Sequence, residues 1–190
     1  MRNGGAKAKG NAFENNISKQ LSLWLTKGVR EDVLIRSQNS GGRATVIATG
    51  GRDFRSQAGD IAPSSIEGTK LTELYIIEVK HYADLVIESL FFKTNKSGIT
   101  EHWAKLLKEC ETYKKLPLYI ARQNRKPILV CTNTKSLEVL KLQNHSDIYI
   151  SSLDLHCLHL SVFLGNASIE NVTIEKEYPM IKPRPLIHRK

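Results

Sequence analysis

The positions of the apolar residues predict a helix near the amino terminus. From Asn11 onwards, large apolar side chains recur at the three- and four-residue spacing that places them on one helical face. Asn11 is a suitable N-cap and Gly28 follows the last apolar position, so we expect a helix of about 13–15 residues. Its apolar face consists of Phe13, Ile17, Leu21, Trp24 and Leu25.

A series of short strands is expected after this helix. Residues 33–36 and 44–48 are rich in β-branched and aliphatic side chains, and residues 60–62 form a third short run before Pro63. Residues 74–79 have the strongest strand pattern in the chain. Their apolar positions are continuous rather than alternating, which is typical of a strand buried on both faces. We therefore expect this strand in the centre of a sheet.

The second half of the chain continues the mixture of helices and strands. The pattern predicts a helix at 100–115 with Trp103 on its apolar face, and a hairpin whose tip is the basic turn 122–126. A strand at 147–150 and an apolar helix at 153–164 should follow. Because helices and strands are interspersed, the predicted fold class is α/β, with a mixed central sheet flanked by helices.

The length and composition suit one domain. With 190 residues, 41% of them hydrophobic, the chain can bury one core but not two of ordinary size. We expect a single domain at 11–181, with a flexible basic arm at 1–10 and a basic tail at 182–190. No apolar run approaches the roughly 20 residues that cross a bilayer, and no secretory signal follows the amino terminus. We therefore expect a cytoplasmic protein that does not bind a membrane.

Positive charge is concentrated at the two ends of the chain. The formal net charge is +9, from 28 Lys and Arg against 19 Asp and Glu. Residues 1–55 carry 10 basic and 4 acidic side chains, and residues 182–190 carry 4 basic ones and no acidic one. The segment between them is nearly neutral. Such patches favour a polyanion as partner, and nucleic acid is the first candidate.

Three acidic residues and one lysine form the pattern with the clearest chemistry. Glu78 and Lys80 lie two residues apart at the end of the strongest strand, so their side chains point to the same face. Asp60 begins an earlier strand, and antiparallel pairing of the two strands would bring it beside Glu78. Glu14 lies within about 20° of Leu21 on a helical wheel, on the buried side. Hard carboxylate ligands of this kind predict an Mg²⁺ or Mn²⁺ site with Lys80 beside the attacking water.

This order of residues resembles the PD-(D/E)xK nuclease superfamily. Glu14 lies on a helix, Gly59-Asp60 on a turn and Glu78-Val79-Lys80 on a strand. The sequence is most similar to the branch of archaeal Holliday junction resolvases and related phage nucleases, because a basic stretch precedes Glu14 and a loop at 40–43 follows the first strand. The resemblance covers about residues 7–131 and implies a restriction-endonuclease-like fold. Gly59 stands where the superfamily motif has Pro.

The resemblance also implies a role for each residue of the motif. Asp60, Glu78 and the main-chain carbonyl of Val79 would bind Mg²⁺, or alternatively Mn²⁺, and Glu14 would complete the set or bridge a second cation. Lys80 would orient or deprotonate the water that attacks phosphorus. The residues expected to contact DNA are Ser40, at the scissile phosphate, and the basic residues Lys7, Lys9, Arg36, Arg43, Arg52 and Arg55.

The predicted function is that of a metal-dependent endodeoxyribonuclease that acts on branched DNA and needs no small-molecule cofactor. Cutting both strands of a two-fold symmetric junction requires two equivalent sites, so we expect a homodimer. Two alternatives remain open: a restriction- or recombination-type nuclease acting on duplex or single-stranded DNA, and a DNA-binding module of the same fold without catalysis. Carboxylates of Asp60 and Glu78 more than about 7 Å apart could not share one cation.

Each of these residues also has a simpler explanation. Glu78 and Lys80 could form an exposed pair at a strand end, and Glu14 could be an acid favoured by the dipole at a helix start. The loop at 40–43 could be an ordinary turn, since Gly and Ser are common in turns. The first two explanations require these side chains to be exposed or to lie at a helix start, which a structure can test.

Overall fold

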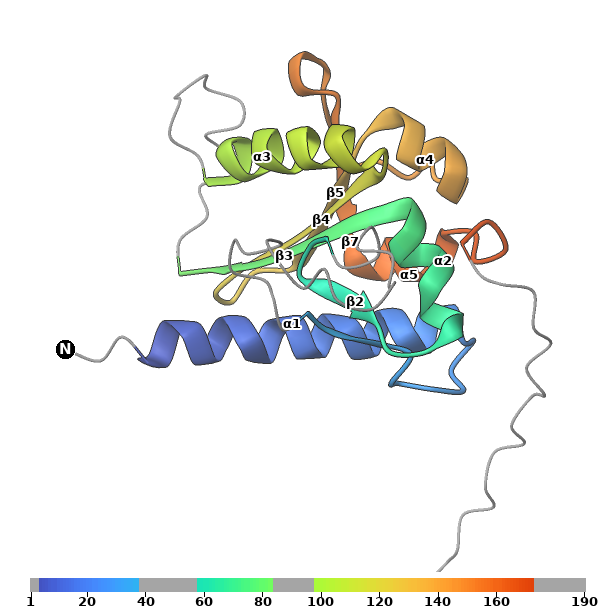
Figure 1. Ribbon diagram of the computed structural model, residues 1–190. Coiled ribbons are helices and arrows are strands. Elements are labelled where there is room, and N and C mark those ends of the chain that lie inside the picture. Colours follow the sequence, from blue (N-terminus) through green and yellow to red (C-terminus); the bar gives the residue numbers. More distant parts are fainter. Residues whose placement is uncertain (1–3, 38–57, 84–97, 173–190) are drawn as a thin grey trace, which may run out of the picture.

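A computed structural model describes residues 4–37, 58–83 and 98–172 of the chain (Figure 1). Several predicted features lie outside these residues. They are the strand at 44–48, the basic tail at 182–190, and the side chains of Ser40, Arg43, Arg52 and Arg55. Among the helices that the described ranges contain, none is long and apolar enough to cross a membrane.

The centre of the fold is a five-stranded mixed sheet. The first two strands in its spatial order run parallel, and the other neighbours are antiparallel. This arrangement, with helices on both faces, confirms the predicted α/β class and is that of a restriction-endonuclease-like fold. In spatial order the strands are β3 (Tyr75–Tyr82), β4 (Leu116–Gln123), β5 (Ile128–Thr132), β7 (Leu155–His159) and β6 (Ile148–Ile150).

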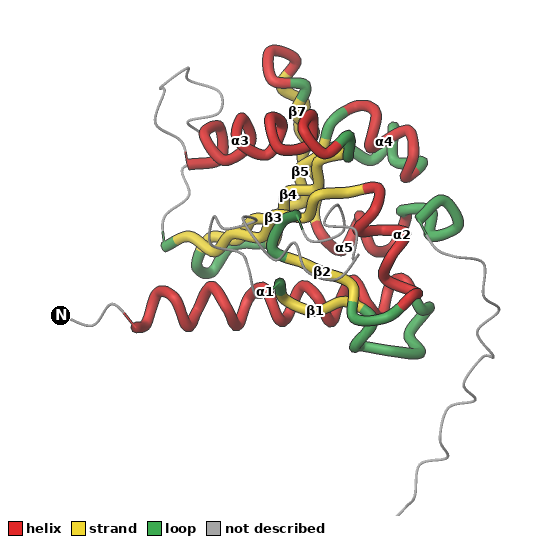
Figure 2. The backbone as a smooth tube through the Cα atoms, in the orientation of Figure 1, coloured by secondary structure: helices red, strands yellow, loops and turns green. Residues whose placement is uncertain are grey.

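Helices cover both faces of this sheet. Figure 2 shows α1 (Gly4–Leu25) below the sheet and α3 (Gly98–Tyr113) above it. α5 (Leu160–Asn166) lies on the α1 side, where the rings of Phe163 and Trp24 are 5.2 Å apart. The core is therefore divided into two layers, one on each side of the sheet.

The first helix has the predicted apolar face but begins earlier than predicted. α1 starts at Gly4 rather than after Asn11, so residues 4–10, which were expected to precede the helix as an arm, are part of it. The Ala and Lys residues of this stretch have high helix propensity, which extends the helix beyond its apolar face. The predicted carboxyl end is confirmed. Gly28 adopts φ +86° and donates its N–H to Leu23 O at 2.7 Å.

A small second sheet lies beside α1. β1 (Leu34–Arg36) pairs antiparallel with β2 (Ile61–Pro63), and Figure 2 shows both strands beside α1. α2 (Ile66–Leu74), which the apolar pattern did not predict, follows β2. Gly68 of α2 packs so closely on the chain that a Cβ there would collide with the carbonyl oxygen of Val33. This contact anchors α2, and with it the end of β2, against the start of β1.

The prediction that the strongest strand is central is wrong. β3 is the first strand in the order of the five-stranded sheet, and its other edge meets the chain only through an isolated parallel bridge between Gly59 and Ile77 among the described residues. Its continuous apolar pattern has another cause: Ile77 and Val79 face the α1 layer, whereas Ile76 faces α3. A continuous apolar pattern shows that a strand is buried on both faces. Helices bury both faces of β3 here, so the pattern does not show how many strands lie beside it.

The second half of the chain agrees with the prediction except near residue 155. The predicted helix at 100–115 and the hairpin with its tip at 122–126 correspond to α3 and to β4 and β5. Residues 153–164, predicted as one apolar helix, form strand β7 followed by the short helix α5. A short apolar run has the same pattern in a buried strand as in a buried helix. A helix at Thr134–Leu140, α4, was not predicted.

Candidate active site

Gly59 places Asp60 beside the middle of β3. Gly59 has φ +91°, and a Cβ there would lie 2.7 Å from the carbonyl oxygen of Ile77. The next residue, Asp60, donates its backbone N–H to the same oxygen at 2.8 Å. The bridge is parallel, so the antiparallel pairing expected from the sequence is wrong. Proline cannot adopt this φ, which explains why Gly precedes the aspartate in this chain.

Asp60 and Glu78 are held together by Lys80. Asp60 is 3% exposed, and its Oδ2 accepts hydrogen bonds from the Val79 N–H at 2.9 Å and from Lys80 Nζ at 2.7 Å. The same Nζ lies 2.5 Å from Glu78 Oε1. The two carboxylate oxygens that contact this one nitrogen are therefore no more than about 5.2 Å apart. This is within the separation at which two carboxylates can share a cation.

The main chain of Val79 is part of the same edge. The Val79 side chain is buried in the core layer next to α1, opposite the side chains of Glu78 and Lys80. Its N–H points to Asp60. In a strand, the N–H and C=O of one residue point to the same side, so the Val79 carbonyl also faces the edge that carries Asp60. A backbone oxygen is therefore available beside the two carboxylates.

Glu14 approaches this edge from α1. Its carboxylate forms an ion pair with Arg36 of β1, with 2.5 Å between Oε2 and Nε. Burial raises the pKa of Glu14, and although Arg36 opposes this rise, the nearby charge of Asp60 adds to it. Glu14 lies in the middle of α1 and is mostly buried, so it is not a helix-start acid. We refer to Glu14, Asp60, Glu78 and Lys80 as the carboxylate site.

The electrostatics of the carboxylate site favour additional positive charge. Burial raises the pKa of Glu78 to about 7, and the neighbouring charge of Asp60 adds to the rise while Lys80 opposes it. Burial alone would lower the pKa of Lys80, but Asp60 and Glu78 outweigh it and raise that pKa. Lys80 therefore remains an ammonium group, and its single charge is too little to keep all the surrounding carboxyl groups ionised.

A further acidic residue, Glu109 of α3, faces the site and was not predicted. Burial raises the pKa of Glu109, and the charge of Asp60 contributes to the rise. Glu109 also adds to the raised pKa of Glu78. On a helical wheel it lies about 120° from the buried residue Trp103 and about 100° from the buried residue Cys110. Such a flanking position is typical of a solvated acid, so the sequence carried no signal for it.

The donors fit a hard divalent cation, although side chains do not enclose a binding site. Within the described ranges, no three His, Cys, Asp or Glu side chains are close enough to hold a metal ion as they stand. Lys80 Nζ occupies the position between Asp60 and Glu78. Two carboxylates that converge on one positive group, with a carbonyl at the same edge, supply the hard oxygen ligands that Mg²⁺ and Mn²⁺ prefer.

The predicted DNA-contacting residues are only partly described. Lys7 and Lys9 lie on α1 and are exposed. Arg36, predicted to contact phosphate, lies at the carboxylate site in its ion pair with Glu14. Ser40 and the remaining arginines fall in the segment between residues 37 and 58, outside the described residues.

A comparison with known proteins supports the resemblance that was drawn from the order of the motif residues. The model of a family described as "Phage putative PDDEXK endonuclease" matches residues 5–178, which is most of the chain. No curated protein and no solved structure matches it. The matched range contains Glu14, Asp60, Glu78 and Lys80, and it extends beyond the segment on which the resemblance was based. The chain therefore belongs to this family of phage PD-(D/E)xK endonucleases.

Proposed function

We propose that this protein is a divalent-metal-dependent endodeoxyribonuclease whose active centre is the carboxylate site. The observation that carries the proposal is the contact of Lys80 Nζ with both Asp60 and Glu78 at the edge of β3. An acid pair and a lysine in this geometry have no evident structural purpose, since a buried ion pair adds little to stability compared with apolar packing. The family membership supports the same reaction class.

Each residue has a distinct part in the proposed reaction. Asp60, Glu78 and the Val79 carbonyl would hold one Mg²⁺ or Mn²⁺, and Glu14 would complete the set or bridge a second cation. When bound, the cation would lower the pKa of the attacking water and stabilise charge on the transferred phosphate. Lys80 keeps its proton while two carboxylates contact it. It is therefore suited to orient the water and to donate a hydrogen bond to a phosphate oxygen, rather than to act as the first base.

For the substrate, we propose branched DNA cut by a homodimer. The support is the resemblance to the resolvase branch, which rests on the basic stretch before Glu14 and on the loop at 40–43. In this proposal Ser40 contacts the scissile phosphate, and Arg43, Arg52 and Arg55 contact flanking phosphates. The alternatives are a nuclease for duplex or single-stranded DNA, and a DNA-binding module without catalysis.

One cleavage experiment separates these possibilities. The full chain is incubated with Mg²⁺ and labelled four-way junction, flap, duplex and single-stranded DNA, and Lys80→Ala and Glu78→Gln are compared with Glu111→Gln. Glu111 is an exposed acid of α3 and serves as the matched control. We expect cleavage by the wild type and by Glu111→Gln only. Cleavage restricted to junctions would support the resolvase-type substrate, whereas DNA binding without cleavage of any substrate would contradict the enzyme proposal.

A further inference from the structure

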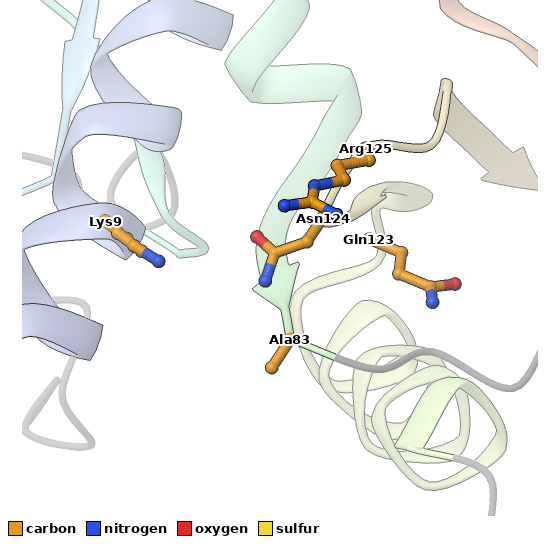
Figure 3. Close-up of a pocket in the computed structure, with 5 residues that line it drawn as sticks. All are labelled: Lys9, Ala83, Gln123, Asn124 and Arg125. Atoms are coloured by element: carbon orange, nitrogen blue, oxygen red, sulfur yellow. The ribbon is translucent and has the colours of Figure 1, made fainter.

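An open pocket of about 470 Å³ lies beyond the end of β3. Three separate segments meet there, namely the first turns of α1, the residue after β3 and the β4–β5 turn (Figure 3). Among the residues that the structure describes, none that lines the pocket is acidic. The lining residues are Lys9, Ala83, Gln123, Asn124 and Arg125, and we call this site the tip pocket.

The polar groups of the tip pocket are held in place by neighbouring contacts. The backbone N–H of Asn124 donates to Tyr82 O at 3.1 Å, which fixes the turn to the end of β3. Asn124 Oδ1 lies 3.0 Å from His81 Nε2. Because an amide oxygen can only accept, His81 is the donor, and the NH₂ group is the part of the Asn124 side chain that can donate to a ligand. Figure 3 shows the Asn124 side chain on the side of the pocket that faces Lys9.

α1 is connected to the same group of residues. Lys9 is four residues before Phe13, so the two side chains lie on one face of α1. The Phe13 ring packs against the His81 ring, with 5.4 Å between centroids. The residue that orients Asn124 therefore also contacts the helical face that carries Lys9, so α1 and the turn are placed relative to each other by packing.

The chemistry of the lining points to a phosphate group. Lys9 supplies an ammonium group, Arg125 a guanidinium group and Asn124 an amide NH₂, and all three are hydrogen-bond donors. Two positive charges, with no acidic side chain in the described part of the lining, favour an anion, and the fork of a guanidinium matches the oxygens of a phosphate.

The tip pocket lies close to the carboxylate site, both along α1 and along the direction of β3. Ala83 is three residues beyond Lys80, which is about 10 Å along an extended strand. Lys9 is five residues before Glu14, about 7.5 Å along the helix. A DNA strand rises about 3.4 Å per nucleotide along the duplex axis, so both offsets correspond to a few nucleotides.

We propose that the tip pocket binds the phosphate backbone of the DNA, with Lys9 and Arg125 each at a phosphate, a few nucleotides from the phosphate that is cleaved. This inference rests on the proposed nuclease function, because it takes the carboxylate site as the point of cleavage. The pocket contacts no base edge in this proposal, so it contributes affinity and register rather than sequence preference.

Salt-dependent binding of labelled duplex and four-way junction DNA tests the proposal, with Ca²⁺ in place of Mg²⁺ to limit cleavage. Removing one phosphate contact should lower the slope of log Kd against log salt by about 1, and removing two should lower it by about 2. We expect a decrease of about 1 for Lys9→Ala and for Arg125→Ala, and a decrease of about 2 for the double variant.

Two variants with the same loss of charge serve as controls. Lys105 is exposed on α3, across the sheet from α1, and Lys126 is exposed on the same turn as Arg125 without lining the pocket. Lys105→Ala and Lys126→Ala should change the slope by less than half as much. Equal slopes for the pocket and control variants would mean that only total charge matters, which would overturn the proposal.

Arg125→Gly separates lost binding from lost folding. Arg125 has φ +62°, a conformation that Gly adopts without strain. The variant should unfold at the same temperature as the wild type or higher, and still lose about 1 from the salt slope. An unchanged slope would overturn the proposal. Failure of the proposed nuclease function is distinguishable, because it appears as absent cleavage with Mg²⁺ while the salt slopes still report on the pocket.

Discussion

The carboxylate site and the tip pocket both include a residue of α1 and lie along and just beyond β3, but they differ in burial. Asp60 is almost fully buried, and its charge is balanced by direct contact with Lys80. Asn124 and Arg125 of the tip pocket are exposed to water. A buried charge that loses its partner is not compensated by solvent, whereas an exposed one is. Substitutions in the carboxylate site should therefore affect activity and folding strongly, and those in the tip pocket should affect DNA affinity alone.

The largest effect is expected for Asp60→Asn. The substitution keeps the shape of the side chain but removes the charge that faces Lys80 and the Val79 N–H. If Asp60 is a cation ligand, the cleavage rate with Mg²⁺ should fall by at least about 10³-fold. Asp147→Asn makes the same change on the exposed surface and should leave the rate unchanged. Comparable rates for both variants would contradict the assignment of Asp60.

Gly59→Ala should damage the carboxylate site through the backbone. The added Cβ would lie 2.7 Å from Ile77 O, at a φ that Ala rarely adopts. We expect unfolding in urea to show a loss of about 3 kcal/mol and cleavage to weaken with it. Gly165→Ala is the control, because a Cβ there meets nothing within 4 Å and the residue lies in α5. The control should be stabilised by about 0.5–1 kcal/mol, and equal stabilities would refute this account of the turn.

The stability of the metal-free protein should depend on pH through Glu78. Its pKa is about 7 in the folded protein, against an ordinary value of 4.5. The folded state therefore binds the proton more tightly than the unfolded state. The corresponding stability is fully present below pH 4.5 and is lost as the pH rises through about 7.

Thermal unfolding in EDTA at several pH values measures this effect. The midpoint of the wild type should fall between pH 5 and 8, and Glu78→Gln should remove most of the fall. Added Mg²⁺ should raise the midpoint more at pH 8 than at pH 5, since a cation binds the ionised carboxylates. The same pH dependence in Glu78→Gln as in the wild type would show that another group is responsible.

The carboxylate site could be predicted from the sequence to a greater extent than the sheet around it. The same-face placement of Glu78 and Lys80 follows from the period of a strand, and the inward position of Glu14 follows from the period of a helix. These relations are local, and the structure has both. The pairing of Gly59 with β3 is not local, because periodicity shows that a strand is buried without showing which segment lies beside it.

The tip pocket and Glu109 could not be predicted for a related reason. Lys9, Ala83 and Arg125 come from three segments that are distant in the chain, and each one alone is typical of a solvated surface. The packing of Phe13 on His81, the parallel pairing of β3 with β4 and the hydrogen bonds of Asn124 to the end of β3 bring them together. Tertiary contacts bring the residues of such a pocket together, and the periodicity of a single sequence does not predict tertiary contacts.

The smallest effect is expected for Glu109→Gln, which changes the charge around the carboxylate site without touching its direct contacts. Because Glu109 contributes to the raised pKa of Glu78, its removal should lower that pKa. The pH at which metal-free stability is lost should then move down by less than about one unit. Glu111→Gln, an equal change on the exposed side of α3, should leave that pH where it is. A shift to higher pH in Glu109→Gln would mean that the Glu109 carboxyl stabilises ionised Glu78 by hydrogen bonding rather than repelling its charge. Glu109 would then be part of the active centre rather than a neighbour of it.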